Sequence, residues 1–526
     1  MCAVRLHVPG RDWNRRAVLK SGLFAAVGWP LLGHVESAFA RRKVGMGDYP
    51  FSLGVASGDP APDGFVIWTR LAPKPLDGGG MPEENVEVSW QVADDEKFSK
   101  VVAKGTAVAT PNLAHAVHVE VPGLEPNRWY FYQFSASGET SPIGRARTAP
   151  AADDVPERLR FAFASCQHYE QGLFTAYKHM AEEDLDLVAH LGDYIYEYAG
   201  KENAVRKHVG PVLDLLVDYR NRHAQYKTDE FLQAMHAKCP WIVTWDDHEF
   251  ANNCAGLISE KPEETPDIYA RRRVNAYRAY YEHMPLRDRQ IPQGPSMRLY
   301  RNVSFGNLAE FAVLDTRQYR TDQPCGDGNK PPCPEVYSKR ATLLGKTQEE
   351  WLYKTLDKSQ AKWNVLTQQV MMARADRTNG EVKAYSMDQW PGYEANRQRV
   401  LEYFSEHPEQ NNVVITGDIH CNWVNDLEFA AAEGSAAKVV ATEFVGTSIS
   451  SGGDGSETRK DTAGVLAENP FVKFFNAERG YVSCEITPKQ WTSFYRTVPF
   501  VSKPGAPLVT RKAFVVEAGK PGAEPV

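Results

Sequence analysis

The segment VAHLGDYIYEY, residues 188–198, determines how the rest of the sequence is interpreted. Its apolar start is typical of a buried strand, and the run ends abruptly at a Gly-Asp pair. Asp193 and Tyr196 stand three positions apart just beyond that end, so one turn can place a carboxylate and a phenol on the same side. Tyr194 and Tyr198 are assigned to packing.

Three other apolar runs also end in side chains that can bind a metal. They are FASCQH with Cys166, TWDDHEFANN with Asp246, Asp247, His248, Asn252 and Asn253, and ITGDIHCNW with Asp418 and His420. In open α/β sheets, functional sites form beyond the carboxyl ends of the strands. We therefore expect these four strand ends to converge on one site.

The order of apolar and helical segments predicts two domains. Residues 44–150 contain short β-rich runs separated by turn residues, which is typical of a small β-sandwich. Residues 159–515 alternate buried-strand runs with helical segments such as 267–284, and this pattern predicts an α/β domain with a mixed sheet. The C-terminal residues 517–526 are expected to be a frayed tail.

The N-terminus, residues 1–40, is expected to be a cleaved export signal. Arg15 and Arg16 precede an apolar segment that ends in the Ala-Phe-Ala of residues 38–40. The arginine pair resembles a Tat signal, so we expect contact with the Tat export machinery and a periplasmic or secreted protein. No later stretch is long and apolar enough for a stable membrane anchor.

Composition narrows the class of protein further. The chain has 526 residues, of which 42% are hydrophobic and 24% charged, a globular composition. The formal net charge of −7 argues against a nucleic-acid-binding surface, which would be basic. Cys325 and Cys333 bracket the Gly/Pro-rich loop GDGNKPP and can close a small disulfide in an oxidising compartment.

The residue types at the strand ends point to two kinds of metal. Carboxylate and amide oxygens suit hard divalent ions such as calcium. A thiolate, a phenolate and an imidazole together favour a more Lewis-acidic transition metal; Fe(III) is the natural candidate, and the ligand types also suit zinc. Two metals that share a bridging carboxylate form a clamp for in-line displacement at phosphorus.

Three motifs carry a family resemblance. In this order, GDYIY, WDDHE and GDIH resemble the metallophosphoesterase superfamily, with Asp247 and Asp418 in place of its usual Asn and first His. These departures, together with Cys166 in SCQ, resemble the PhoD-type alkaline phosphatases. The stretch 51–73 is similar to the small N-terminal domain of that family, and LDTRQYR and EFVGTSISSGG also fit. The resemblance covers nearly all of the chain after residue 40.

The resemblance implies a four-layered αββα catalytic domain preceded by a small β-sandwich. It also implies Fe(III) bound by Cys166, Asp193, Tyr196 and His420. A second site, with calcium or another divalent metal, would take Asp193 as the bridge together with Asp247, Asp418 and an oxygen from Asn252 or Asn253. The choice between the two asparagines stays open, and Asn253 is taken as the candidate.

Two further residues are candidates for catalysis. The resemblance places His248 next to the leaving-group oxygen. Arg317, in LDTRQYR, ends another strand, where its guanidinium either holds a phosphate oxygen or forms a salt bridge under the sheet.

The expected function is hydrolysis of phosphate mono- or diesters outside the cytoplasm by a monomeric enzyme. A water activated by the metals would attack in line, without a covalent phospho-enzyme, because there is no nucleophilic serine at a helix start. One alternative is a phosphodiesterase or phospholipase D-like hydrolase. A second alternative is a non-catalytic protein that binds cell-wall polymer and holds its metals structurally.

Overall fold

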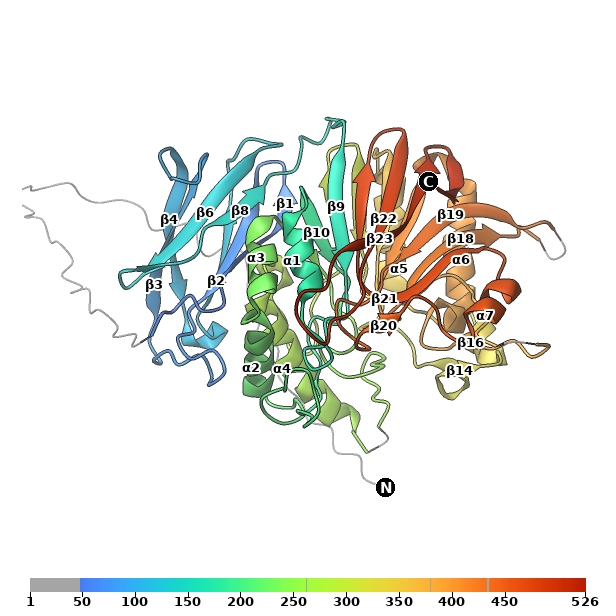
Figure 1. Ribbon diagram of the computed structural model, residues 1–526, viewed down its shortest axis with the longest axis horizontal. Helices are drawn as coiled ribbons and strands as arrows, with labels where there is room; N and C mark the ends of the chain where they lie inside the picture. The colour runs from blue at the N-terminus through green and yellow to red at the C-terminus, as the bar shows by residue number, and fades with distance from the viewer. Residues whose placement is uncertain (1–47, 262, 379, 433–434) are drawn as a thin grey trace, which may run out of the picture. The chain divides into compact units, whose positions relative to one another are not determined.

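Two mixed β-sheets that share one long strand form the centre of the computed structural model (Figure 1). The structure describes residues 48–261, 263–378, 380–432 and 435–526, so the predicted signal lies outside the described residues. These residues belong to one of the two compact units of the chain, Gly45–Val526.

The first sheet has the strand order β5-β2-β1-β11-β10-β9-β21-β22-β23-β24. Its strands β9, β10 and β11 are parallel, and their carboxyl ends therefore meet at the same edge. The bounds are β1 Val55–Ala61, β2 Gly64–Arg70, β5 Ala116–Val121, β9 Leu159–Ala164, β10 Leu187–His190, β11 Trp241–Val243, β21 Val472–Ile486, β22 Gln490–Val498, β23 Val509–Glu517 and β24 Lys520–Pro525.

The second sheet has the order β12-β13-β15-β17-β19-β18-β21. Strand β21 pairs with β18 through its first residues and with β9 through its last, so it joins the two sheets. The bounds are β12 Arg301–Phe305, β13 Ala309–Val313, β15 Trp363–Thr367, β17 Asn412–Thr416, β18 Asn422–Phe429 and β19 Lys438–Val445.

Helices cover the outer face of each sheet. Three separate apolar clusters follow the layers: one between the first sheet and α1 to α4, one between the two sheets, and one between the second sheet and α5 and α6. The bounds are α1 Thr175–Glu182, α2 Leu216–Lys227, α3 Glu230–Lys238, α4 Pro266–His283, α5 Gly345–Lys358, α6 Glu394–Glu406 and α7 Thr462–Glu468. This arrangement confirms the expected αββα architecture.

The β-rich N-terminal part forms a sandwich that is continuous with the first sheet. Strands β3 Val86–Ala93, β4 Val101–Ala109, β6 Trp129–Ala136, β7 Glu139–Thr140 and β8 Gly144–Arg147 form a separate sheet, while β1, β2 and β5 extend the larger one. Gly58 of β1 lies opposite Trp241 of β11, and a Cβ at Gly58 would stand 2.5 Å from the Pro285 carbonyl oxygen. Only glycine permits this close junction.

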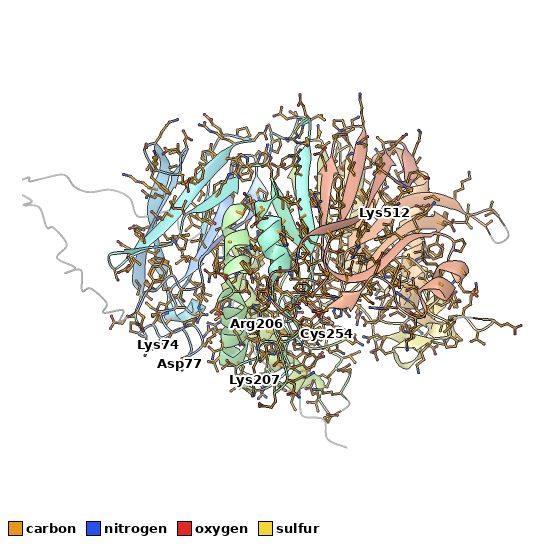
Figure 2. The ribbon with its side chains drawn as sticks, in the orientation of Figure 1. Lys74, Asp77, Arg206, Lys207, Cys254 and Lys512 are labelled. Carbon is orange, nitrogen blue, oxygen red and sulfur yellow. A yellow bond between two sulfur atoms is a disulfide. The ribbon has the colours of Figure 1, made fainter. Side chains whose placement is uncertain are left out.

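The connection from β10 to α2 is held in place by buried and half-buried polar contacts. Arg206, labelled in Figure 2, pairs with Asp229 at 2.6 Å and stacks over the Tyr169 ring at 3.9 Å. Glu170 Oε1 accepts hydrogen bonds from the backbone N–H groups of Lys201 and His208. This connection carries Tyr196 and the residues that follow it, so these contacts position one wall of the site.

Two expectations about the less regular segments have different outcomes. The Cys325–Cys333 disulfide is confirmed, with the two Cα atoms 5.8 Å apart. The prediction of a frayed C-terminal tail is wrong, because residues 520–525 form β24. The Gly522 and Ala523 amides donate to Thr442 Oγ1 and Asp426 Oδ1. The remaining short elements are β14 Asn329–Lys330, β16 Tyr385–Ser386, β20 Gly455–Ser456 and the 3₁₀ turns η1 Pro111–Leu113, η2 Asp288–Gln290, η3 Pro324–Gly326, η4 Pro334–Tyr337, η5 Trp390–Tyr393 and η6 Pro408–Gln410.

Candidate metal centre

The four strand ends that were singled out in the sequence converge at one place. Cys166 follows β9, Asp193 and Tyr196 follow β10, Asp246 and Asp247 follow β11, and Asp418 and His420 follow β17. Three groups of these side chains, described below, each have ligand atoms within 4.8 Å of one another. The parallel pairing of β9, β10 and β11 explains why their loops meet.

The backbone at these loops is strained in a way that is typical of functional sites. The φ angles of Cys166, Asp193, Asp418 and His420 are 58°, 55°, 67° and 53°. All four lie in the left-handed region, which residues other than glycine rarely adopt. Such conformations cost on the order of 1–3 kcal/mol each and persist only where the surroundings enforce them. Four of them around one cluster indicate that side-chain placement is enforced at the expense of backbone energy.

The first group joins the thiol, one carboxylate, the phenol and an imidazole. The ligand atoms of Cys166, Asp193 and His420 lie within 4.8 Å of one another. The Tyr196 hydroxyl donates to Asp193 Oδ2 at 2.7 Å and lies 3.2 Å from His420 Nε2. All four side chains proposed from the sequence for iron therefore lie together, and Ser451 Oγ adds a hydrogen bond of 2.8 Å to the phenol.

The second set consists of carboxylates and one histidine. Asp193, Asp247 and His248 form one group, and Asp246, Asp247 and Asp418 form another. Asp193 therefore belongs to the thiol group as well as to the carboxylate set. Asp246 was named among the side chains at this strand end, but the sequence analysis assigned it to neither metal.

Arg317 lies among three of these acidic side chains and a fourth, Asp388. Its guanidinium, only 1% exposed, pairs with Asp246, with Asp388 at 2.9 Å, with Asp418 at 3.2 Å and with Asp247 at 3.6 Å. These carboxylates raise the pKa of Arg317 well above its usual value, although burial opposes the rise. Its donors are engaged by carboxylates rather than directed at open space.

The two candidate asparagines have different surroundings. The Asn253 amide N–H donates to Asp247 Oδ2 at 2.6 Å, and its side-chain nitrogen donates to Asp327 of the disulfide loop at 2.6 Å. The Asn252 side chain donates to Glu260 Oε2 at 2.8 Å. Asn253 is thus the asparagine in direct contact with the carboxylate set.

Burial makes the anionic forms of these ligands costly in the protein alone. It raises the pKa of Cys166, Asp193, Tyr196 and Asp246, in each case as the largest cause, with neighbouring carboxylates adding to the rise. Asp246 Oδ2 and Asp247 Oδ1 are buried without a hydrogen-bond partner. Bound cations would remove both costs, so the donor set fits metal ions.

His248 is paired with an acid that the sequence analysis missed. Its Nδ1 lies 2.7 Å from Glu197 Oε2, and its ring packs 4.2 Å from the Tyr196 ring. Glu197 also accepts the backbone N–H of Asn252 at 2.9 Å. The signal was its place in GDYIYE, because it directly follows the candidate ligand Tyr196.

Two further residues that the sequence analysis missed form hydrogen bonds that hold the candidate ligands in place. Glu249 accepts the backbone N–H groups of Asp193, Tyr194 and Asp246 at 2.6–3.1 Å, which fixes two candidate ligand loops. Gln389 donates to Asp418 Oδ2 at 3.0 Å. Glu249 stands within the quoted motif WDDHE, and Gln389 stands in DQWPGYEANRQRVL, residues 388–401, another stretch similar to the family, in which no role was assigned to it.

The fold and the cluster together define a metallophosphoesterase-type hydrolase. The profile of the family described as PhoD-like phosphatase matches residues 161–495, and that of its N-terminal domain matches residues 37–150. The chain belongs to the PhoD-like phosphatase family, and it is an enzyme that hydrolyses phosphate esters. The alternative of a non-catalytic binding protein does not hold.

Individual relatives agree with this assignment. Alkaline phosphatase D from Bacillus subtilis is 53% identical over 483 residues, which cover 91% of this chain and 82% of the relative. A solved structure described as "Structure of PhoD" matches with a TM-score of 0.88 and 53% identity over 91% of this chain and 92% of that one. GAP50 of Plasmodium matches with a TM-score of only 0.34 at 12% identity, over 68% of this chain and 89% of that one, and carries no argument.

Proposed function

We propose that this enzyme is a two-metal alkaline phosphatase that releases phosphate from small phosphate mono- or diesters outside the cytoplasm. The observation that carries the proposal is the position of Asp193, which takes part in the thiol group and in the carboxylate set at once. A carboxylate so placed suits a bridge between two cations.

Fe(III) is proposed at Cys166, Asp193, Tyr196 and His420, because a thiolate, a phenolate and an imidazole favour a strongly Lewis-acidic ion. Calcium, or another divalent metal, is proposed at Asp193, Asp247, Asp418 and Asn253, since oxygen ligands suit hard cations. When bound, the metals supply Lewis-acid chemistry that neutralises phosphoryl charge and acidifies water. Asp246, held by Arg317, is assigned to orienting the carboxylate set.

The chain's own residues supply orientation and proton transfer. Glu197 holds His248 through Nδ1, which leaves Nε2 as the atom that can give a proton to the departing alkoxide. For Arg317, its four ion pairs support the salt-bridge role over direct phosphate binding. In this role it keeps the acidic residues apart and partly neutralised.

Export and assembly state remain part of the proposal. The arginine pair at residues 15 and 16 supports Tat export to the periplasm or beyond after cleavage near residue 40. Among the described residues, no helix combines the length and apolarity needed to cross a bilayer. We assign the β-sandwich to residues 44–150, the catalytic domain to 159–515, and a monomeric state to the enzyme.

The test combines elemental analysis with two chromogenic substrates. The purified protein is expected to contain iron and calcium and to hydrolyse p-nitrophenyl phosphate, and its bis ester separates a monoesterase from a diesterase. A ligand-to-iron charge-transfer colour would identify the thiolate and phenolate site. Full activity in protein free of any metal would overturn the proposal.

A further inference from the structure

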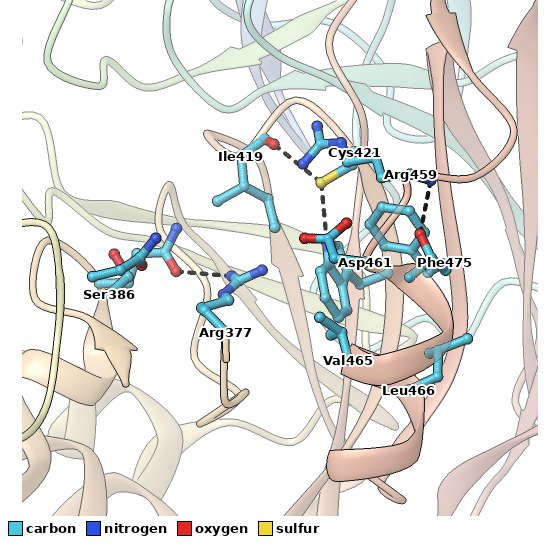
Figure 3. A pocket seen from close by; sticks show the side chains of 13 residues that line it. Arg377, Ser386, Ile419, Cys421, Arg459, Asp461, Val465, Leu466 and Phe475 are labelled. Carbon is cyan, nitrogen blue, oxygen red and sulfur yellow. Dashed lines mark hydrogen bonds between the residues drawn. The ribbon is translucent and has the colours of Figure 1, made fainter. Parts of the chain in front are cut away.

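A cavity of about 320 Å³ adjoins the carboxylate end of the metal centre (Figure 3). Its wall includes Ile419 and Cys421, the residues on either side of His420. Gln389 also lines it and donates to Asp418 Oδ2 at 3.0 Å. The cavity therefore shares Gln389 and the loop 418–421 with the metal centre, although no candidate metal ligand lines its wall.

Two arginines enter the cavity from different sides (Figure 3). Arg377 donates to Gln389 Oε1 at 3.4 Å, and its guanidinium stands 4.8 Å from the centre of the Trp423 ring. The Arg459 guanidinium stands 5.8 Å from the centre of the Phe475 ring. The aromatic contacts keep the two guanidinium groups spread and oriented, and they leave most of the N–H donors available.

The charge of the cavity is not balanced by the protein. Within the described part of the chain, neither Arg377 nor Arg459 forms an ion pair with a carboxylate. Asp461 is the one carboxylate among the described lining residues, so the wall carries more positive than negative side chains. The rest of the wall combines apolar side chains, among them Trp423, Val465 and Leu466, with four uncharged polar ones, Asn329, Ser386, Gln389 and Thr462.

This balance contrasts with the neighbouring metal centre. There the guanidinium of Arg317 is engaged by four carboxylates, and the remaining acidic side chains suit cations. Guanidinium donors without a carboxylate partner, on a wall that is apolar in part, instead suit an anion joined to a carbon skeleton, because guanidinium geometry matches carboxylate and phosphate oxygens.

We propose that this cavity is a subsite for the alcohol portion of the substrate and that Arg377 and Arg459 bind a second anionic group on that portion. The preferred substrates are then phosphate esters whose leaving group carries a carboxylate or a further phosphate. The inference rests on the proposed function of the metal centre and extends it to specificity.

The test compares matched pairs of substrates by phosphate release. One pair is 4-carboxyphenyl phosphate with 4-carbamoylphenyl phosphate, and the other is butane-1,4-diol bisphosphate with butyl phosphate. The wild type is expected to show the higher kcat/KM on the anionic member, and the two pairs separate a carboxylate from a phosphate as the recognised group. The alcohol product 4-hydroxybenzoate should inhibit more strongly than 4-hydroxybenzamide.

Arg459→Gln is the decisive variant, because Arg459 forms no hydrogen bond or ion pair with a described side chain of the metal centre. Loss of one charge-assisted contact should lower the anionic-to-neutral ratio about tenfold, and Arg459→Lys should restore part of it. The control is Lys460→Gln, which removes a neighbouring exposed charge outside the cavity and should keep the wild-type ratio.

Either of two results overturns the inference. One is a wild type that shows no preference for the anionic substrate in either pair. The other is an Arg459→Gln variant whose anionic-to-neutral ratio of kcat/KM equals that of Lys460→Gln. Failure of the metal-loaded wild type to hydrolyse any of the four monoesters, or p-nitrophenyl phosphate, would instead overturn the monoesterase activity in the proposed function.

Discussion

His248 Nδ1 and Glu197 Oε2 lie 2.7 Å apart, and both side chains are almost completely buried. Neither residue can turn without breaking this contact, because Glu197 is also held by the Asn252 amide. A histidine fixed through one ring nitrogen presents the other in a constant direction. The pair thus links the loop after β10 with the loop after β11.

The first prediction concerns this pair. Glu197→Gln keeps the size of the side chain but removes the charge that holds and stabilises the imidazolium. We expect kcat to fall about 10- to 100-fold, within the range that a general acid contributes, with little change in KM. The acidic and basic limbs of the kcat–pH profile should also move. An unchanged profile with normal kcat, or loss of bound metal, would contradict a positioning role.

The second prediction concerns the proposed bridge. Asp193→Asn removes the negative charge shared by both ligand groups, so both metals should bind more weakly. We expect elemental analysis to show metal loss and turnover to fall at least about 100-fold, the loss that even outer-shell partners of a metal can cause. Glu202→Gln, at an exposed acid in the adjoining loop, is the control. A fully metallated, active Asp193→Asn protein would show that Asp193 is not needed as a bridge between the two metals.

Much of the fold was predictable because the inner parallel strands appear in the sequence as continuous apolar runs. The predicted runs at 158–166, 187–193 and 412–418 contain the observed strands β9, β10 and β17. Strands β21 to β24 were not predicted, because they are antiparallel and carry alternating polar residues. The placement of β24 depends on hydrogen bonds to Thr442 and Asp426, which are distant in sequence. No local sequence pattern indicates such contacts.

The ligand types of the site were predictable from the strand ends, and their convergence follows from the parallel topology. The supporting contacts were not. Gln389 reaches Asp418 from a separate connection, and Arg317 reaches Asp246 and Asp388 across 71 residues each. Side-chain pairs of this kind depend on how loops are placed in three dimensions, and their spacing in the sequence carries no signal.

The third prediction concerns a buried histidine cluster beneath the first sheet. Burial lowers the pKa of His190 to about 3 and those of His223, His236 and His283 well below the usual value, while Lys227 and Arg70 add repulsion. Neither ring nitrogen of His223 has a hydrogen-bond partner. All four rings are therefore expected to be neutral in the folded protein at neutral pH.

The sign of the effect follows from linkage. The unfolded rings titrate near pH ~6.5, so below that pH the unfolded state binds more protons and stability falls as the pH falls. Each ring contributes up to about 1.4 kcal/mol per pH unit in that range. His223→Phe should flatten the decline in denaturant-unfolding free energy between pH 7 and 5. The same slope in wild type and variant would show that His223 takes up no proton on unfolding.

The fourth prediction concerns the disulfide loop. Asp327 and Asn329 lie between Cys325 and Cys333; Asp327 accepts from Asn253, and Asn329 lines the cavity beside the metal centre. Replacing both cysteines by serine should loosen these contacts and raise KM about 3- to 10-fold, which corresponds to about 0.7–1.4 kcal/mol. A reductant should raise the KM of the wild type and leave that of the double variant unchanged. Equal KM values for the oxidised wild type, the reduced wild type and the double variant would show that the disulfide loop does not contribute to substrate binding.

The fifth prediction separates backbone strain from steric contact. Gly192 precedes Asp193 with φ at +106°, and a Cβ there would stand 2.4 Å from the backbone nitrogen of Asp246. Gly210 has a similar φ of +92°, but a Cβ there meets nothing within 4 Å. Alanine at either position pays the left-handed penalty of about 1–2 kcal/mol. Only Gly192→Ala also pushes two candidate ligand loops apart.

Gly192→Ala is therefore expected to lose metal and to lower kcat about tenfold or more, because a shift of about 1 Å in a catalytic group can cost 100-fold. Gly210→Ala should lower the unfolding temperature slightly and keep its metal content and its kcat. If both variants lost activity to the same degree, strain alone would account for the effect. If neither did, the distance between the loops after β10 and β11 would not control the metal centre.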